Sequence, residues 1–246
     1  MNRYYYDLHI HSCLSPCADD DMTPNNIAGM SMLNGIRVVA LTDHNTCGNC
    51  PAFFEACRRV GVIPIAGMEL TTIEEIHMVC LFPDLEKAMK FDEFIREHRM
   101  PIKNRPDIFG EQLIMNENDD VIGIEENLLI MATDIDITTA AHIVRDDYAG
   151  VAFPAHIDKQ SNGIIGVLGD FPLEPGFTAA EFHNIEKQES YLKKYPVLQE
   201  LIIVADSDAH RLEDTSLEPP IFNDIDDDGN EDQIRQSIIL KLRGEL

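Results

Sequence analysis

The 246-residue sequence predicts a single α/β barrel domain of about seven strand–helix units, and three observations support this fold class. Short apolar runs alternate with polar turns and helical stretches along most of the chain, which favours a mainly parallel sheet. The length is within reach of one barrel domain, and no repeat or linker divides residues 1–246. Reactive polar side chains recur where the apolar runs end, and barrels of this kind carry their chemistry at strand ends.

The order of the predicted elements follows from apolar periodicity and from turn residues. Strands are expected at residues 4–10, 37–42, 62–69, 76–82, 150–157, 179–183, 201–207 and, at the end of the series, 221–225. Helices are expected at residues 24–35, 51–60, 85–99, 137–148 and 232–243. The first helix shows the signals most clearly, since Thr23 can cap it, Pro24 suits its first position and Gly35 ends it. Residues 100–136 carry prolines between short apolar pieces and are expected to form an excursion that contains helices.

The composition is strongly acidic, with 19 Lys and Arg against 44 Asp and Glu and a formal net charge of −25. Such a charge repels phosphate backbones, so nucleic acid is a disfavoured partner, although bound divalent metals allow an acidic protein to attract a small anionic substrate. No apolar run reaches the roughly 18 residues that a membrane span needs, and the N-terminus lacks an apolar signal segment. We therefore expect a cytoplasmic protein without a membrane partner; its oligomeric state is open.

Cysteines give an ambiguous signal. Four of the six lie in loops that follow predicted strands, namely Cys13, Cys17, Cys47 and Cys50. They are compatible with a structural metal site, a redox pair or inert thiols, and inert thiols are preferred. Cys57 and Cys80 fit buried apolar positions.

The first two strands end in histidine. In the first, strand alternation predicts Asp7, His9 and His11 on one face, where two imidazoles can chelate one metal ion, and Leu8 and Ile10 on the other face. The second runs directly into Asp43 and His44.

Further potential ligands stand at the ends or starts of the later strands. Glu69 ends an otherwise apolar strand, where a carboxylate is costly to bury without a partner such as a metal. Six of the nine histidines occupy strand ends or starts, which ordinary core histidines do not readily explain. These six are His9, His11, His44, His77, His156 and His210, and Asp208 accompanies the last of them. The remaining three are expected to lie outside the cluster, with His183 at best supporting a ligand and His98 and His142 on helices.

The motifs, taken in order, resemble those of the PHP family, which is named after polymerase and histidinol phosphatase. The matching segments are Asp7-Leu8-His9-Ile10-His11-Ser12, Leu41-Thr42-Asp43-His44-Asn45, Ala66-Gly67-Met68-Glu69, Glu75-Ile76-His77, Pro154-Ala155-His156 and Ser207-Asp208-Ala209-His210. Each piece alone is weak, but the ordered set is specific and covers most of the chain. The resemblance implies a distorted, TIM-barrel-like (β/α)7 barrel that holds two or three divalent ions, commonly zinc, manganese or iron.

The resemblance also implies a division of the ligands among three ion sites. The first would use His9, His11, Glu69 and Asp208; the second would share Glu69 and add His77 and His156; the third would use His44, His210 and one residue from the loop after His11.

The loop after His11 departs from the simplest family pattern, because residues 12–22 form a longer segment that carries two cysteines. Asp19 stands at the matching distance before Thr23-Pro24 and is preferred as the loop ligand. Cys17 is the main alternative, since some relatives place a ligand six residues after the second histidine.

This ligand set predicts a metal-dependent hydrolase of phosphate esters acting on a small metabolite or nucleotide, because clustered dications bind phosphate oxygens and lower the pKa of a bridging water. Asp43 and Lys159 are the candidate catalytic residues, with Asp43 placed to orient a ligand imidazole or simply to form a turn. Lys159 and Arg211 are candidate substrate contacts, although both also fit ordinary surface charges. An exonuclease and a non-catalytic metal-binding regulator are the alternatives, and His and carboxylate ligands do not choose between zinc, manganese and iron.

Overall fold

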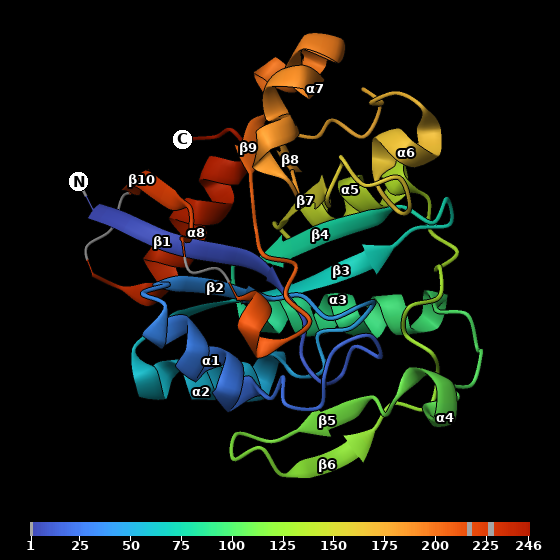
Figure 1. Cartoon of the computed structure of the whole chain (residues 1–246), viewed down its shortest axis with the longest axis vertical. Coiled ribbons are helices and arrows are strands. Elements are labelled where there is room, and N and C mark those ends of the chain that lie inside the picture. Colours follow the sequence, from blue (N-terminus) through green and yellow to red (C-terminus); the bar gives the residue numbers. More distant parts are fainter. Residues whose placement is uncertain (1, 216–217, 226–228) are drawn as a thin grey trace.

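A curled six-stranded sheet organises the computed structural model, which describes residues 2–215, 218–225 and 229–246 (Figure 1). In spatial order its strands are β10 (Ile221–Ile225), β1 (Asn2–Ile10), β2 (Val38–Leu41), β3 (Ile63–Thr71), β4 (His77–Phe82) and β7 (Val151–Pro154). The central strands β1, β2 and β3 run parallel, whereas β10 is antiparallel to β1, and β4 is antiparallel to both β3 and β7. The predicted parallel character therefore holds for the centre of the sheet.

The antiparallel β4 has a simple cause in chain length. Only residues 72–76 connect β3 to β4, which is too short for the crossover that a parallel neighbour requires. Glu75 in this connection has a φ of 62°, and its backbone N–H donates to the carbonyl of Thr72 at 2.9 Å. A tight turn thus replaces a helix at this point of the alternation.

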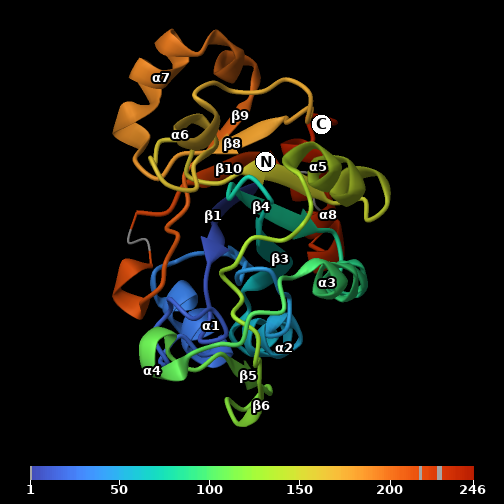
Figure 2. The same ribbon diagram turned by 90° about the vertical axis from the view of Figure 1, so that its right-hand side faces the viewer.

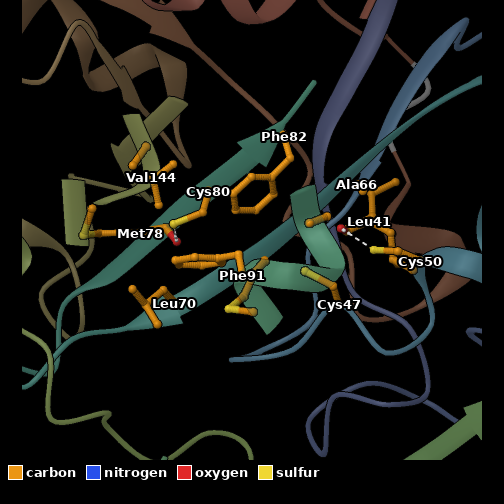
Figure 3. Packing of buried hydrophobic residues seen from close by; sticks show 14 of the residues in the cluster. Leu41, Cys47, Cys50, Ala66, Leu70, Met78, Cys80, Phe82, Phe91 and Val144 are labelled. Atoms are coloured by element: carbon orange, nitrogen blue, oxygen red, sulfur yellow. Dashed lines mark hydrogen bonds between the residues drawn. The ribbon is translucent and has the colours of Figure 1, made fainter. Parts of the chain in front are cut away.

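Helices cover both faces of the sheet (Figures 1 and 2). Apart from one short helix described below, the helices are α1 (Pro24–Leu33), α2 (Cys50–Val60), α3 (Leu85–His98), α5 (Ile137–Asp146), α6 (Ile164–Leu168), α7 (Gln188–Lys194) and α8 (Glu231–Leu242). Of these, α7 lies above β8 and β9 in Figure 1 and not on the six-stranded sheet. One hydrophobic cluster joins Phe53 of α2 and Phe91 of α3 to Phe82 of β4. Figure 3 shows Phe82 and Phe91 packed against each other between β4 and α3. A second cluster joins Leu8 of β1 to Ile238 of α8 on the opposite face. No helix in the described ranges is long and apolar enough to cross a membrane.

Two further strands extend the curl. β8 (Ala179–Glu181) and β9 (Ile202–Val204) form a separate parallel pair. The N–H of Ile157, beyond β7, donates to the carbonyl of Glu181 at 2.9 Å, and the N–H of His11, beyond β1, donates to that of Ala209 at 3.0 Å. No ladder joins β7 to β8 or β9 to β1 in the part of the chain that the structure describes. The structure is thus a mixed α/β fold with a half-barrel sheet, and the closed seven-stranded barrel expected from the sequence is not shown.

Carboxylates join β1 to the segment after β9. The N–H of Leu8 donates to Asp206 Oδ1 at 2.7 Å, and the N–H of Ser207 donates to Asp7 Oδ1 at 3.1 Å. Asp7 and Asp206 are both buried. Side chains therefore make the contacts that backbone groups make within a regular ladder.

The excursion predicted for residues 100–136 contains less helix than expected. It holds one short helix, α4 (Pro106–Phe109), and a hairpin of β5 (Leu113–Met115) and β6 (Val121–Ile124), which lie apart from the main sheet in Figure 1. The hairpin was not predicted because its strands span three and four residues, too few for a clear alternation. The Asn45 amide donates to the carbonyls of Leu129 and Met131 at 2.6 and 2.9 Å, so the end of the excursion lies against the residues after β2.

Candidate metal centre

Glu69, near the carboxyl end of β3, lies at the centre of the predicted ligand set. Its carboxylate is 1% exposed. Five ring nitrogens approach its two oxygens: His77 Nδ1 (2.9 Å), His156 Nε2 (3.1 Å) and His9 Nε2 (3.3 Å) at Oε1, and His44 Nδ1 (3.0 Å) and His11 Nε2 (3.3 Å) at Oε2. Side chains separated by as many as 147 positions in the sequence thus converge on one carboxylate.

A β-bulge near the end of β1 re-aims the first two histidines. Asp7 pairs with Val39 and Ile10 with Leu41, so the register between β1 and β2 shifts within this stretch. Leu8 packs in the cluster on the α8 side of the sheet, whereas Ile10 packs in the other cluster. The expected strict alternation, with Leu8 and Ile10 on one face, is therefore wrong.

The backbone turns sharply at two ligand positions. His156 has a φ of 30° and Asp208 a φ of 51°, in the left-handed region that residues other than glycine rarely adopt. Each such residue costs on the order of 1–3 kcal/mol, and strain of this kind concentrates at functional sites. Here it carries one imidazole and one carboxylate to the cluster from the ends of two different strands.

Donor atoms form three overlapping sets, and within each set they lie within 4.8 Å of one another. The sets are His9, His11, Glu69 and Asp208; His44, Glu69 and His77; and His11, His44 and His210. His9 Nε2 and His11 Nε2 face each other at 3.2 Å, a distance at which only one of the two nitrogens can carry a proton. A set of imidazoles and carboxylates is the ligand chemistry of zinc, iron and manganese, so these residues fit divalent metal ions.

The electrostatics of the cluster favour cations. Burial lowers the pKa of His11, but hydrogen bonds to Asp208 and Glu69 outweigh it and raise the pKa to about 9. The pKa of His44 is also about 9, since Glu69 and the thiol of Cys17 outweigh burial. Burial raises the pKa of Glu69, yet the surrounding imidazoles hold it well below its usual value. The buried carboxylates thus attract positive charge, for which protons and metal ions compete.

Glu181 supports the cluster and was missed by the sequence analysis. This fully buried residue of β8 contacts His9 Nδ1 at 2.9 Å through Oε2 and at 3.1 Å through Oε1, and it accepts the N–H of His156 at 3.2 Å. A carboxylate on the far ring nitrogen fixes the orientation of a ligand histidine. The available signal was the one used for Glu69, a carboxylate within an apolar strand. His183, considered in its place, is not among the residues that line the cavity described below.

Asp43 lies behind the cluster and not at its surface. Its buried carboxylate accepts the N–H and hydroxyl of Ser12 at 2.7 and 2.6 Å and the hydroxyl of Ser15 at 2.7 Å. Ser15 Oγ lies 3.0 Å from His11 Nδ1 and accepts the N–H of His44 at 3.1 Å. The carboxylate of Asp43 is thus linked through the hydroxyl of Ser15 to the ring of His11 and to the backbone of His44.

A cavity of about 350 Å³ opens over the ligands. Lys159 lies on its wall, where Nζ donates to Asp208 Oδ2 at 2.6 Å with the side chain one-third exposed. The loop that carries this lysine is tightly packed, since a Cβ on Gly163 would lie 2.5 Å from the carbonyl oxygen of Lys159. Ser161 and Asn162 of the same loop also line the cavity, and neither was predicted from the sequence.

Two predicted site residues lie elsewhere. Asp19 and Arg211 are both more than half exposed, and Asp19 Oδ2 is 3.6 Å from Arg211 Nε. Neither residue lines the cavity, and Asp19 belongs to none of the three donor sets. The structure therefore does not bring the preferred loop ligand or the second candidate substrate contact to the site. Cys17, the alternative loop ligand, lines the cavity.

The other loop cysteines lie away from the cavity. Cys47 and Cys50 are buried in the hydrophobic core beside Leu41 and Ala66 (Figure 3). The thiol of Cys47 donates to the carbonyl of Gly67 at 3.1 Å. Cys57 and Cys80 are buried, in agreement with the prediction, and all six cysteines are free.

Fold and site together define a metal-binding α/β protein whose ligands come from the ends of many strands. The PHP domain model matches residues 7–148, more than half of the 246-residue chain. The chain belongs to the PHP family, as its ordered motifs indicated. Membership identifies a metal-dependent hydrolase in coarse terms and leaves its substrate open.

Two curated proteins share part of the sequence. A 5′-3′ exoribonuclease of Haemophilus influenzae is 31% identical over 102 residues, which cover 38% of this chain and 36% of that protein. An uncharacterised protein of Methanocaldococcus jannaschii is 33% identical over 100 residues, which cover 37% of this chain and 58% of that protein. The matched segments thus span less than two thirds of either relative.

Solved structures share the fold at low sequence identity. A protein of Bifidobacterium adolescentis with a proposed metal-dependent phosphoesterase activity superimposes with a TM-score of 0.56 at 18% identity, covering 84% of this chain and 88% of its own. The lesion-specific endonuclease EndoQ of Pyrococcus furiosus gives 0.58 at 17% identity, covering 86% of this chain and 49% of its own. An amidohydrolase of Chromobacterium violaceum gives 0.57 at 16% identity, with coverages of 89% and 91%. These similarities establish a common fold.

Proposed function

We propose that this protein is a metal-dependent phosphoesterase that hydrolyses a phosphate ester of a small metabolite or nucleotide. The observation that carries the proposal is the convergence of five imidazoles, from the ends or starts of four strands, on the carboxylate of Glu69. We also infer that β1, β2, β3, β4, β7, β8 and β9 form the distorted seven-stranded barrel of the PHP type, with β10 paired at the outer edge of β1.

The residues around the cavity divide the work between binding and orientation. Divalent ions bound by the three donor sets would neutralise phosphate charge and supply an activated water. Lys159 provides an ammonium group at the cavity wall for a phosphate oxygen. Glu181 holds the ring of His9 directly through its far nitrogen, and Asp43 holds that of His11 through the hydroxyl of Ser15. The cavity volume of about 350 Å³ is at the lower end for ligand sites, which favours a small substrate.

The decisive test combines His9→Ala with Asp208→Ala. Wild-type protein loaded with manganese, zinc or iron should release phosphate from a panel of aryl phosphates and nucleotides, and the double variant should release none above background. His142→Ala is the matched control, because His142 is an exposed histidine on α5. Phosphate release that persists in the double variant would refute the proposed site. Wild-type protein that binds metal tightly but turns over no phosphate ester would instead favour a non-catalytic regulator.

Lys159→Met should raise KM far more than it lowers metal content. Loss of a charge-assisted hydrogen bond to phosphate, worth about 1.5–3 kcal/mol, predicts a KM increase of roughly 10- to 100-fold. Steady-state kinetics at fixed metal concentration, together with elemental analysis, would measure both quantities. An unchanged KM at full metal content would remove Lys159 from the substrate site.

An exonuclease acting on nucleic-acid ends is the second candidate, and the relative named as a 5′-3′ exoribonuclease favours it. The net charge of −25 and the presence of Lys159 as the one Lys or Arg among the described residues that line the cavity favour a small substrate. Parallel assays on a nucleotide panel and on a 5′-phosphorylated oligoribonucleotide separate the two functions. Faster turnover of the oligonucleotide would favour the exonuclease.

A further inference from the structure

Ile130 is the one aliphatic side chain among the described residues that line the cavity over the ligand cluster. Every other lining side chain in this part of the chain carries a polar or ionisable group. The two leucines that precede it, Leu128 and Leu129, are 7% and 1% exposed, whereas Ile130 is only partly buried. Core packing thus accounts for the leucines but leaves apolar surface of Ile130 at the cavity wall.

Side-chain hydrogen bonds fix the backbone on both sides of Ile130. The Asn45 amide donates to the carbonyl of Leu129 at 2.6 Å and to that of Met131 at 2.9 Å, the residues directly before and after Ile130. The N–H of Leu129 donates to Gln112 Oε1 at 2.9 Å. The chain therefore presents Ile130 to the cavity in a defined position.

Asn45 also connects this segment to the metal centre. It directly follows the ligand His44 and has a φ of 51°. Its N–H donates to the carbonyl of Glu69 at 2.9 Å, and its Oδ1 accepts the N–H of Thr71 at 2.8 Å. One residue thus sets the position of Ile130 relative to two ligands. A wall that is ordered in advance loses little conformational freedom when a substrate binds against it.

The loop after β7 forms a second, polar part of the wall. The Asn162 amide donates to the carbonyl of Glu75 at 2.9 Å, and its own carbonyl accepts the N–H of His77 at 2.9 Å. A Cβ on Gly166 would lie 2.8 Å from the carbonyl oxygen of Lys159, so this loop is tightly packed. The cavity therefore offers a positive charge for phosphate on this loop and an apolar surface on Ile130.

We propose that Ile130 is a specificity-determining residue that packs against the leaving group of the substrate. The protein then prefers phosphate monoesters whose alcohol carries an apolar ring or chain over monoesters of polyhydroxylated alcohols. This inference rests on the proposed phosphoesterase function and names its substrate class. With the phosphate held at the ligand cluster and Lys159, the leaving group fills the rest of the cavity, where contact with Ile130 removes apolar surface from water. A polyol in the same place would lose water from its hydroxyl groups against an apolar side chain.

Benzyl phosphate and ethyl phosphate test this contact, because both are esters of primary alcohols and differ in apolar size. In metal-loaded wild-type protein, kcat/KM should be higher for benzyl phosphate, and Ile130→Ala should lower the benzyl-to-ethyl ratio by roughly tenfold or more. Ile122→Ala is the matched control, since Ile122 is a 65% exposed isoleucine of the β5–β6 hairpin, and it should keep the wild-type ratio. An unchanged ratio in Ile130→Ala at wild-type metal content would overturn the inference.

Binding of non-hydrolysable phosphonates to the wild-type protein gives a second measurement that involves no variant and no turnover. Titration calorimetry on metal-loaded protein should find benzylphosphonate bound at least about tenfold more tightly than dihydroxypropylphosphonate. Equal affinities, or tighter binding of the polyol, would overturn the inference. Such a failure in a protein that hydrolyses other phosphate esters would leave the proposed function intact, whereas a protein that hydrolyses no phosphate ester would overturn both.

Discussion

Glu69→Gln should reduce metal affinity by more than about 100-fold, beyond the 10- to 100-fold loss expected when a residue only orients a ligand. The substitution keeps the shape of the side chain but removes the charge that five imidazoles surround. It also places an amide N–H₂ donor where the ring nitrogens need an acceptor or a cation. Elemental analysis and kcat/KM on the phosphate-ester panel should fall together.

Glu181→Gln is the matched comparison, because Glu181 is equally buried and contacts only the far nitrogen of His9 among the ring nitrogens of the ligands. It should weaken metal binding by roughly 10- to 100-fold, and higher metal concentrations should restore turnover. Glu69→Gln protein with wild-type metal content would show that Glu69 is not a ligand.

In the metal-free protein, the free energy of unfolding should fall as the pH rises from about 6.5 to 9. His11 and His44 have a pKa of about 9 in the folded chain against a usual value of 6.5. In this range the folded state holds protons that the unfolded state has released, so stability falls with rising pH. The slope is about 1.4 kcal/mol per pH unit for each imidazole that titrates in this way. The contribution is complete below pH 6.5 and is lost as the pH passes the folded pKa.

Bound metal should reverse this trend, because an ion takes the place of the protons and binds more tightly as they leave. Zinc at about 1,000 times its dissociation constant adds roughly 4 kcal/mol to the free energy of unfolding. Urea unfolding between pH 6 and 9, with zinc and with a chelator, measures the difference in the free energy of unfolding between the zinc-bound and the metal-free protein. If this difference stays constant or becomes smaller toward high pH, the protonation states assigned to His11 and His44 are wrong.

Much of the site was predictable because its polar, ionisable side chains stand next to apolar strand residues in the sequence. Histidines and carboxylates are unusual ends for apolar strands, and strand ends of an α/β sheet meet on one side. The sequence therefore predicted that His9, Glu69 and Asp208 lie together, and the structure brings them into one donor set. The ordered motifs likewise predicted the family, which the domain match over residues 7–148 confirms.

The predictions that the structure does not support concern the direction in which single side chains point. Spacing in the loop after His11 favoured Asp19 as a ligand, but spacing does not determine which side chain turns inward; the structure places Asp19 beside Arg211, and neither Asp19 nor Cys17 belongs to a donor set. Strict alternation failed in β1 because a bulge is a local shift that the sequence pattern does not reveal. Glu181 was not predicted because the histidine pattern pointed to His183, two residues later in the same predicted strand.

The contacts of Asp7 and Asp206 link the retention of a metal ion to the contact between β1 and residues 206–208, which follow β9. Each stands two positions before a member of the first donor set, His9 or Asp208. A cation held between His9 and Asp208 would therefore join the same two segments. The hydrogen bonds from Leu8 to Asp206 and from Ser207 to Asp7 already connect them. Parting of β1 from this segment and escape of the ion are linked equilibria, so each event promotes the other.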